Sequence, residues 1–173
     1  MQIHEPRQQL DHMLRQTRNN LVGFSQMADT KAQVLLSISS VLLSLSIAKV
    51  SDRKFTLTLT ILIIFLLITI FLALLAVVGE VRVFKRKKHS THDPNYSPLF
   101  FGNYGDIPYT EYAEQFTEIM NSSDATYEIM VKDIYYAGKY LLQIKYKYIR
   151  LAYLYFFAGL ILSIAIYFFQ NIL

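Results

Sequence analysis

The chain has 173 residues, no cysteine and a formal net charge of +4 at pH 7. The absence of cysteine excludes a disulfide framework, a thiol nucleophile and a thiolate metal site. The positive charge gathers at residues 82–88, which favours contact with anionic lipid headgroups over nucleic-acid binding.

The first predicted element is a helix over residues 5–31 that continues into an apolar span at 32–48. Leu14 and Leu21 lie on one face of this helix, whereas Arg15 lies outside the apolar face. No proline and no pair of glycines interrupts the passage into the span. We therefore expect one long helix, half in water and half in lipid.

Two further apolar spans are predicted, at residues 55–78 and at the C-terminus over 151–173. Together with 32–48, the span at 55–78 forms a transmembrane hairpin within residues 32–79. Uncharged apolar runs of this length cross the hydrocarbon core of a bilayer. The sequence thus predicts an all-α membrane protein with three transmembrane helices, and a small helical domain at 80–150 between the second and third spans.

Basic residues predict the orientation of these spans. Arg82, Lys85 and their basic neighbours follow the second span, while Lys145, Lys147 and Arg150 precede the third. Because positive charge is retained in the cytoplasm, residues 1–31 and 80–150 are expected on the cytoplasmic side of the membrane and the C-terminus on the outer side.

The segment between the second and third spans is predicted to be partly helical. Residues 89–109 show no periodicity, but they include apolar residues and are expected to pack as a lid or docking loop. A short helix is predicted from Thr110, and a turn at 121–124 supplies an N-cap. A second helix then continues from Ala125 through Arg150 into the last span, with Gly138 as the only candidate interruption.

The first span carries a polar stripe with spacings of three and four residues. Its members are Thr30, Gln33, Ser37, Ser40 and Ser44. We favour helix–helix packing as its role, because small and hydroxylated residues let helices approach closely. A pore lining made by several copies is the alternative. Asp29 and Lys31 lie where the first helix enters the bilayer. They are either interfacial anchors or part of a charge pair with the last helix that controls whether the protein is in a closed or an open state.

A second stripe lies on the helix before the last span. Lys132, Tyr136, Lys139, Gln143 and Tyr146 share one face, and they combine cations for phosphate with rings for a base. A solvated face, with Lys132 paired to Glu128, is the alternative. His89, His92 and Asp93 lack further ligands, so no metal site is expected. The sequence contains no catalytic constellation, and neither enzyme activity nor a cofactor is expected.

Three motifs in order resemble the transmembrane effectors of bacterial Pycsar antiphage defence. They are Ala28-Asp29-Thr30-Lys31-Ala32 at the first span, Pro98-Leu99-Phe100-Phe101-Gly102 in the loop, and Asp133-Ile134-Tyr135 followed by Gly138-Lys139 before the last span. The resemblance implies a partner cyclase that makes cyclic UMP or cyclic CMP on infection. It further implies a location in the bacterial inner membrane, which with the predicted orientation places the C-terminus in the periplasm. The effector is expected to impair that membrane, so that the infected cell stops growing or dies before phage are released.

The residues of these motifs, together with the basic stripe before the last span, are the expected site residues. The nucleotide site is expected at Leu99, Phe100, Phe101, Gly102, Lys132, Asp133, Tyr136 and Lys139, and gating or pore lining at Asp29, Lys31, Ser37, Ser40 and Ser44. The chain is expected to form a homo-oligomer. Two other functions stay open: a membrane anchor or assembly subunit that recruits a partner protein, and an effector of a related cyclic-oligonucleotide defence system.

Overall fold

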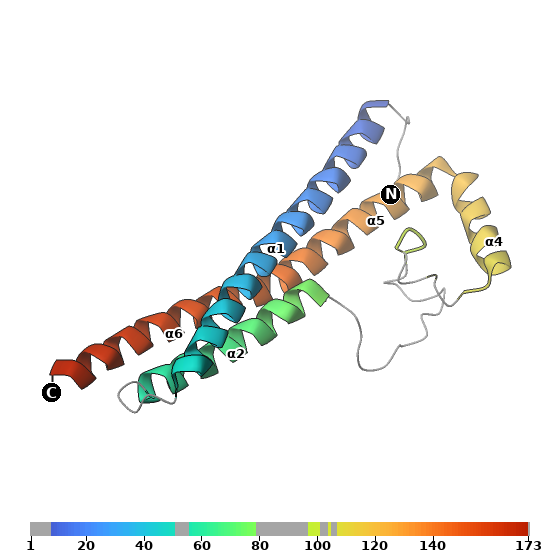
Figure 1. The fold of residues 1–173 in the computed structure, drawn as a ribbon. Helices are drawn as coiled ribbons and strands as arrows, with labels where there is room; N and C mark the ends of the chain where they lie inside the picture. The colour runs from blue at the N-terminus through green and yellow to red at the C-terminus, as the bar shows by residue number, and fades with distance from the viewer. Residues whose placement is uncertain (1–7, 51–55, 79–96, 101–103, 105–106, 173) are drawn as a thin grey trace. The chain divides into compact units, whose positions relative to one another are not determined.

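The computed structural model describes residues 8–50, 56–78, 97–100, 104 and 107–172 (Figure 1). Its helices are α1 (Gln8–Lys49), α2 (Thr56–Val78), α4 (Tyr109–Met120), α5 (Ser123–Tyr140), the π-helix η1 (Leu141–Tyr146) and α6 (Lys147–Ile172). The described residues contain no β-strand, which confirms the predicted all-α class. The basic block at 82–88, the His89/His92/Asp93 cluster, and Phe101 and Gly102 lie outside the described residues.

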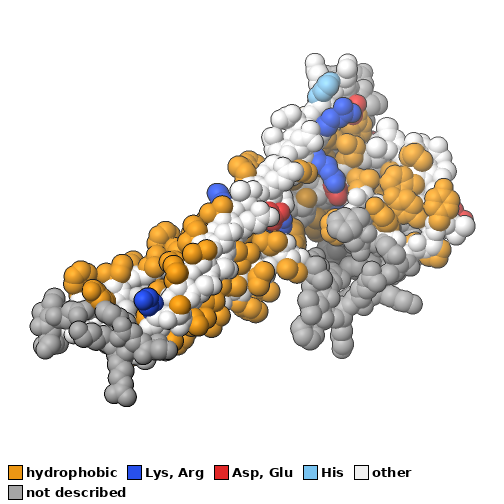
Figure 2. Space-filling view, viewed as in Figure 1, with side chains coloured by type: hydrophobic (Ala, Val, Ile, Leu, Met, Phe, Trp, Pro, Cys, Tyr) orange, Lys and Arg blue, Asp and Glu red, His pale blue; other side chains and the backbone are white. Residues whose placement is uncertain are grey.

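The chain divides into two compact units, which we call the polar unit and the membrane unit. The polar unit comprises Met1–Gly23 and Arg82–Tyr140, and the membrane unit comprises Phe24–Val81 and Leu141–Leu173. Three helical stretches, in α1, α2 and the run that ends in α6, are long and apolar enough to cross a membrane. In Figure 2, hydrophobic side chains crowd the surface of the membrane unit, as expected for a surface that contacts lipid.

Helix α1 confirms the prediction of one long helix. It runs without a break from the polar residues near Gln8 through the predicted span at 32–48 and ends at Lys49. Its residues therefore belong to both units, with Leu14 buried in the polar unit and Ala28, Ala32 and Leu35 buried in the membrane unit.

The core of the membrane unit is made by apolar and small side chains of α1, α2 and α6. Its fully or nearly fully buried members include Leu35 of α1, Leu66 and Ala73 of α2, and Ala152 and Phe156 of α6. Small residues let helices approach closely in a membrane, where burial in lipid alone gives little driving force. Close packing thus holds the three spans together.

Gly159 sets the approach of α6 to α2. A Cβ atom added to Gly159 would lie 2.5 Å from Cβ and 3.0 Å from Cγ of Phe65. These distances are shorter than side chains tolerate, so any other residue would force the helices apart. Gly159 therefore serves the packing of α6 against α2.

The helix before the last span is not uniform. It was expected to be α-helical from Ala125 to Arg150 with Gly138 as the candidate interruption, but Gly138 lies within regular α5 and the winding changes at Leu141. Residues Leu141–Tyr146 form the π-helix η1, which is wider than an α-helix. The residue spacing predicted a regular α-helix here and gave no signal for the change of winding at Leu141.

The corner between α4 and α5 follows the predicted turn. The Ala125 backbone N–H donates to Ser122 Oγ at 3.3 Å, so Ser122 acts as the N-cap of α5. The Thr126 hydroxyl donates to the backbone carbonyl of Ile119 at 2.8 Å. These bonds satisfy backbone groups at both helix ends and fix the corner.

Candidate functional site: polar contacts along α1

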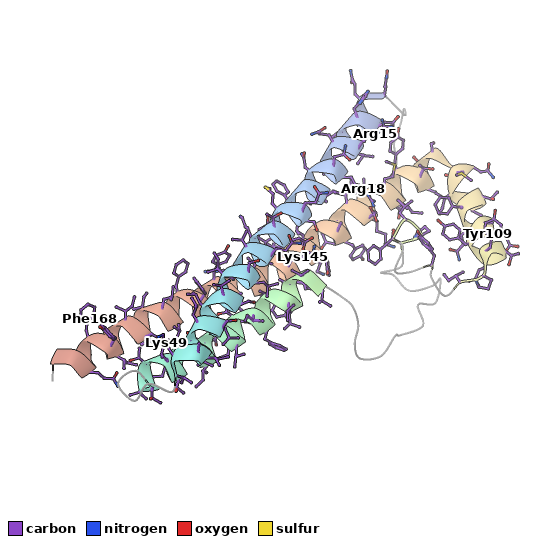
Figure 3. The ribbon with its side chains drawn as sticks, viewed as in Figure 1. Arg15, Arg18, Lys49, Tyr109, Lys145 and Phe168 are labelled. Atoms are coloured by element: carbon purple, nitrogen blue, oxygen red, sulfur yellow. The ribbon has the colours of Figure 1, made fainter. Side chains whose placement is uncertain are left out.

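Lys145 makes a buried polar contact in the membrane unit (Figure 3). Its ammonium Nζ donates to Oδ1 and Oδ2 of Asp29 and to Oγ of Ser25, each at 2.8 Å. Only 10% of the Lys145 side chain is exposed, against 32% for Asp29. Three acceptors match the three donors of a lysine, so the buried charge is both neutralised and fully hydrogen-bonded.

The helices position these three groups by simple spacing. Ser25 and Asp29 are four residues apart on α1, so both side chains face the same side. Lys145 lies in η1, four residues before the buried Ile149 of α6. Its aliphatic stem thus extends the apolar face of α6 while its charged end reaches α1.

Of the two roles considered for Asp29 and Lys31, Asp29 forms a charge pair with the helical segment that leads into the last span, whereas Lys31 takes no part in it. The Lys31 side chain is exposed, and its backbone carbonyl accepts a hydrogen bond from the Tyr153 hydroxyl at 3.4 Å. Lys145 and Ser25 were not among the expected site residues. The signal for Lys145 was its place shortly before the last span, four residues from the apolar Ile149, where a buried charge needs a partner.

A second set of polar contacts joins α1 to α5 within the polar unit. The Tyr127 hydroxyl donates to Asp11 Oδ1 at 2.7 Å, and Arg18 forms an ion pair with Asp133. The Asp133 side chain is only 7% exposed, whereas that of Arg18 is 50% exposed. The hydrogen bond to Asp11 raises the pKa of Tyr127, and burial and the carboxylate charge act in the same direction.

Gly138 lies beside this set of contacts. A Cβ atom added there would meet Leu21 Cδ2 of α1 at 3.7 Å, an ordinary packing distance. Side chains of the N-terminal part of α1 therefore contact α5 in the polar unit.

The described part of the loop packs against α4. The Tyr112 hydroxyl donates to the Pro98 carbonyl at 3.3 Å, and the Tyr112 ring contacts Tyr104 and Phe116 with centroid distances of 4.9 and 4.8 Å. Burial, with a smaller contribution from Tyr104, raises the pKa of Tyr112. These contacts join Pro98 and Tyr104 of the loop to an aromatic cluster on α4.

The expected nucleotide-binding residues occupy several places in the polar unit. Leu99 is half-buried and Phe100 exposed; on α5, Lys132 and Tyr136 are half-buried and Lys139 is exposed. Those three residues of α5 share a face, as their spacing predicts. Asp133 is instead buried and engaged by Arg18. Among the described residues, no group of three or more side chains could hold a metal ion.

The polar stripe of α1 lies on the exposed side of the helix. Thr30, Gln33, Ser37, Ser40 and Ser44 are all exposed, whereas the side that packs in the membrane unit carries Ala28, Ala32, Leu35 and Ser39. The hydroxyls of Thr30, Ser37 and Ser44 donate to backbone carbonyls one turn earlier. The stripe was predicted to pack against another helix, but it does not pack against α2 or α6 of the same chain.

Comparison with known proteins gives one match. The model of the PycTM family, described as a Pycsar effector protein domain, matches residues 12–170. No curated protein and no solved structure gives a significant match. The matched range includes at least part of every helix, the contact of Lys145 with Asp29 and Ser25, and the ion pair of Arg18 with Asp133. The chain therefore belongs to the PycTM family of transmembrane antiphage effectors.

Proposed function

We propose that this chain responds to cyclic UMP or cyclic CMP, made by a partner cyclase on phage infection, and then impairs the inner membrane. Infected cells would stop growing or die before phage are released. The family match and the three apolar spans support this proposal. Residues 1–31 and the segment between the second and third spans would face the cytoplasm, since basic residues flank that segment.

The observation that carries the proposal is that one helix, α1, makes polar contacts in both units. In the polar unit, Asp11 and Arg18 tie this helix to α5; in the membrane unit, Asp29 ties the same unbroken helix to Lys145. A ligand that favours another arrangement of α1 and α5 would therefore act on a helix that enters the bilayer. Population shift of this kind requires differential affinity for the two arrangements.

The nucleotide is proposed to bind at the loop residues 99–102 and the α5 face made by Lys132, Tyr136 and Lys139. Lysine ammonium groups suit a cyclic phosphate, and aromatic rings suit a pyrimidine base. Asp133 would contribute indirectly, because its buried carboxylate holds Arg18 of α1.

Gating is proposed to involve separation of Asp29 from Lys145 after nucleotide binding. Lys31, exposed beside this pair, would stay at the headgroups. Ser37, Ser40 and Ser44 would then face the site of membrane damage, since they lie on the exposed side of α1. In this proposal the chain needs no cofactor other than the messenger, and no catalytic step.

The test combines binding with leakage. Calorimetry of the detergent-solubilised protein compares cyclic UMP, cyclic CMP and a cyclic dinucleotide, and dye release from loaded vesicles measures membrane damage with each. One of the pyrimidine nucleotides should bind and release dye, and Lys139→Glu should weaken both effects. Arg15→Glu, at an exposed cation of α1, is the matched control and should leave binding unchanged.

The outcomes separate the parts of the proposal. Binding of the cyclic dinucleotide alone would support an effector of a related cyclic-oligonucleotide system. Nucleotide binding without dye release would contradict membrane damage, and no binding with no release would favour an anchor or assembly subunit. Equal loss of binding in both variants would refute the α5 site.

A further inference from the structure

Arg18 of α1 forms an ion pair with a carboxylate that is much more buried than itself. Its guanidinium contacts Oδ2 of Asp133 within the polar unit, where the exposed fractions of the two side chains are 50% and 7% (Figure 3). A guanidinium carries five N–H donors in a planar fork. Among the described residues Arg18 has no partner besides Asp133, so several of its donors remain directed to solvent.

The ion pair lies next to the basic face of α5. At about 100° per residue, Asp133, which follows Lys132 directly, lies about 60° from Tyr136 around the helix. Gly138, where α5 meets a side chain of α1, lies about 140° from Asp133 in the opposite direction. Arg18 therefore reaches from α1 to the border of the face that carries Lys132 and Tyr136.

Positive charge exceeds negative charge at this border. Lys132 is half-buried, and its ammonium group forms no hydrogen bond or ion pair with any residue that the structure describes. The pairing with Glu128 that the sequence left open is therefore not formed. Asp133 neutralises Arg18 and leaves the charge of Lys132 without a counterion. A half-buried cation beside unused N–H donors favours the binding of an anion.

We propose that Arg18 binds the phosphate of the nucleotide together with Lys132, an assignment that rests on the proposed function for the identity of the nucleotide. Arg18 keeps its bond to Asp133, because a buried carboxylate without a counterion is strongly unfavourable. It binds the phosphate with its remaining N–H groups, whose planar fork matches phosphate oxygens. Asp133 is then a positioning residue that orients the guanidinium, and one phosphate contacts both α1 and α5.

Calorimetry of the detergent-solubilised full chain with cyclic UMP and cyclic CMP tests this assignment. Arg18→Gln combined with Asp133→Asn leaves two amides that can bond to each other and no lone buried charge. Affinity for the nucleotide should fall about ten-fold or more, as expected on loss of a charged hydrogen bond. Arg15→Gln, at an exposed cation of α1, is the matched control and should leave the affinity unchanged. Unchanged affinity in the double variant, or equal loss in both, would overturn the proposal.

Unfolding by sodium dodecyl sulfate separates lost binding from lost structure. The double variant should unfold at a detergent fraction close to that of the parent chain. If it unfolds much earlier, Arg18→Lys decides instead, because it keeps the ion pair with Asp133 and loses the planar fork. It should weaken nucleotide binding several-fold, and an affinity equal to that of the parent chain would then overturn the proposal.

Failure of the proposed function gives a different result. If the parent chain binds neither cyclic nucleotide, the proposed ligand is wrong, and thermal unfolding in inorganic phosphate instead of chloride tests the anion site alone. Phosphate strengthens apolar burial in any protein, so the decisive quantity is the gain in unfolding temperature relative to the double variant. A larger gain in the parent chain, retained by Arg15→Gln, supports a phosphate site at Arg18, and any other pattern overturns it.

Discussion

Removal of the Asp29 carboxylate is the sharpest test of how the membrane unit is held together. Asp29→Ala deletes two of the three acceptors of the Lys145 ammonium and leaves the lysine charge without a counterion. Lys145 is largely buried, so water replaces the lost carboxylate poorly. The variant should therefore lose more stability than the loss of ordinary hydrogen bonds would cause.

The expected magnitudes follow from the geometry. Breaking a buried ion pair costs about 3–5 kcal/mol, and the partial exposure of Asp29 places this variant near about 3 kcal/mol. Ser25→Ala removes one acceptor of a charged donor and should cost about 1.5 kcal/mol. The double change Asp29→Ala with Lys145→Met removes both charges and should return to within about 1 kcal/mol of the parent chain.

The assay is unfolding by sodium dodecyl sulfate from mild detergent micelles, followed by far-ultraviolet circular dichroism. Gln26→Ala, an exposed position of α1 between Ser25 and Asp29, is the control and should change stability little. If the double variant were no more stable than Asp29→Ala, the two side chains would not be coupled. In that case the reasoning from the ion pair would be wrong.

Three other predictions concern packing and protonation. Gly159→Ala should destabilise the membrane unit by about 1–3 kcal/mol, because its Cβ would overlap Phe65, and thermal unfolding in detergent measures this. Gly138→Ala should stabilise the protein by up to about 1 kcal/mol in the same assay, because the new Cβ meets only an ordinary contact. Titration by tyrosinate absorbance should place Tyr127 above the usual pKa of a tyrosine, and Asp11→Asn should bring its pKa down.

The sign of the Tyr127 effect follows from its raised pKa. The folded chain binds the phenolic proton more tightly than the unfolded chain, so this stabilisation is complete below the ordinary tyrosine pKa. It is lost as the pH rises through the higher pKa of the folded state. Tyr127→Phe should remove this part of the alkaline loss of stability, and an unchanged alkaline profile would contradict the assignment.

The two glycine variants should change the stability in opposite directions. Stabilisation by both alanines would contradict the close approach at Gly159.

The sequence by itself determined the spans and most helix positions. Apolar length predicted three membrane-crossing segments, and the unbroken helical pattern from residue 5 predicted that the first span and the amphipathic segment form one helix. These features depend on local composition and on a repeat of three to four residues, which the chain carries in its own order. The capped turn at Ser122 is local in the same way.

Only the tertiary structure decided which side of each helix is packed and which charges meet. The stripe from Gln33 to Ser44 was correctly placed on one face, but spacing does not tell whether that face points inward or outward. The partnership of Asp29 with Lys145 joins residues more than a hundred positions apart, and it is reached through a π-helical segment that no local pattern reveals. Both outcomes depend on how separate helices pack, because packing alone selects the buried face and brings distant polar groups into hydrogen-bonding range.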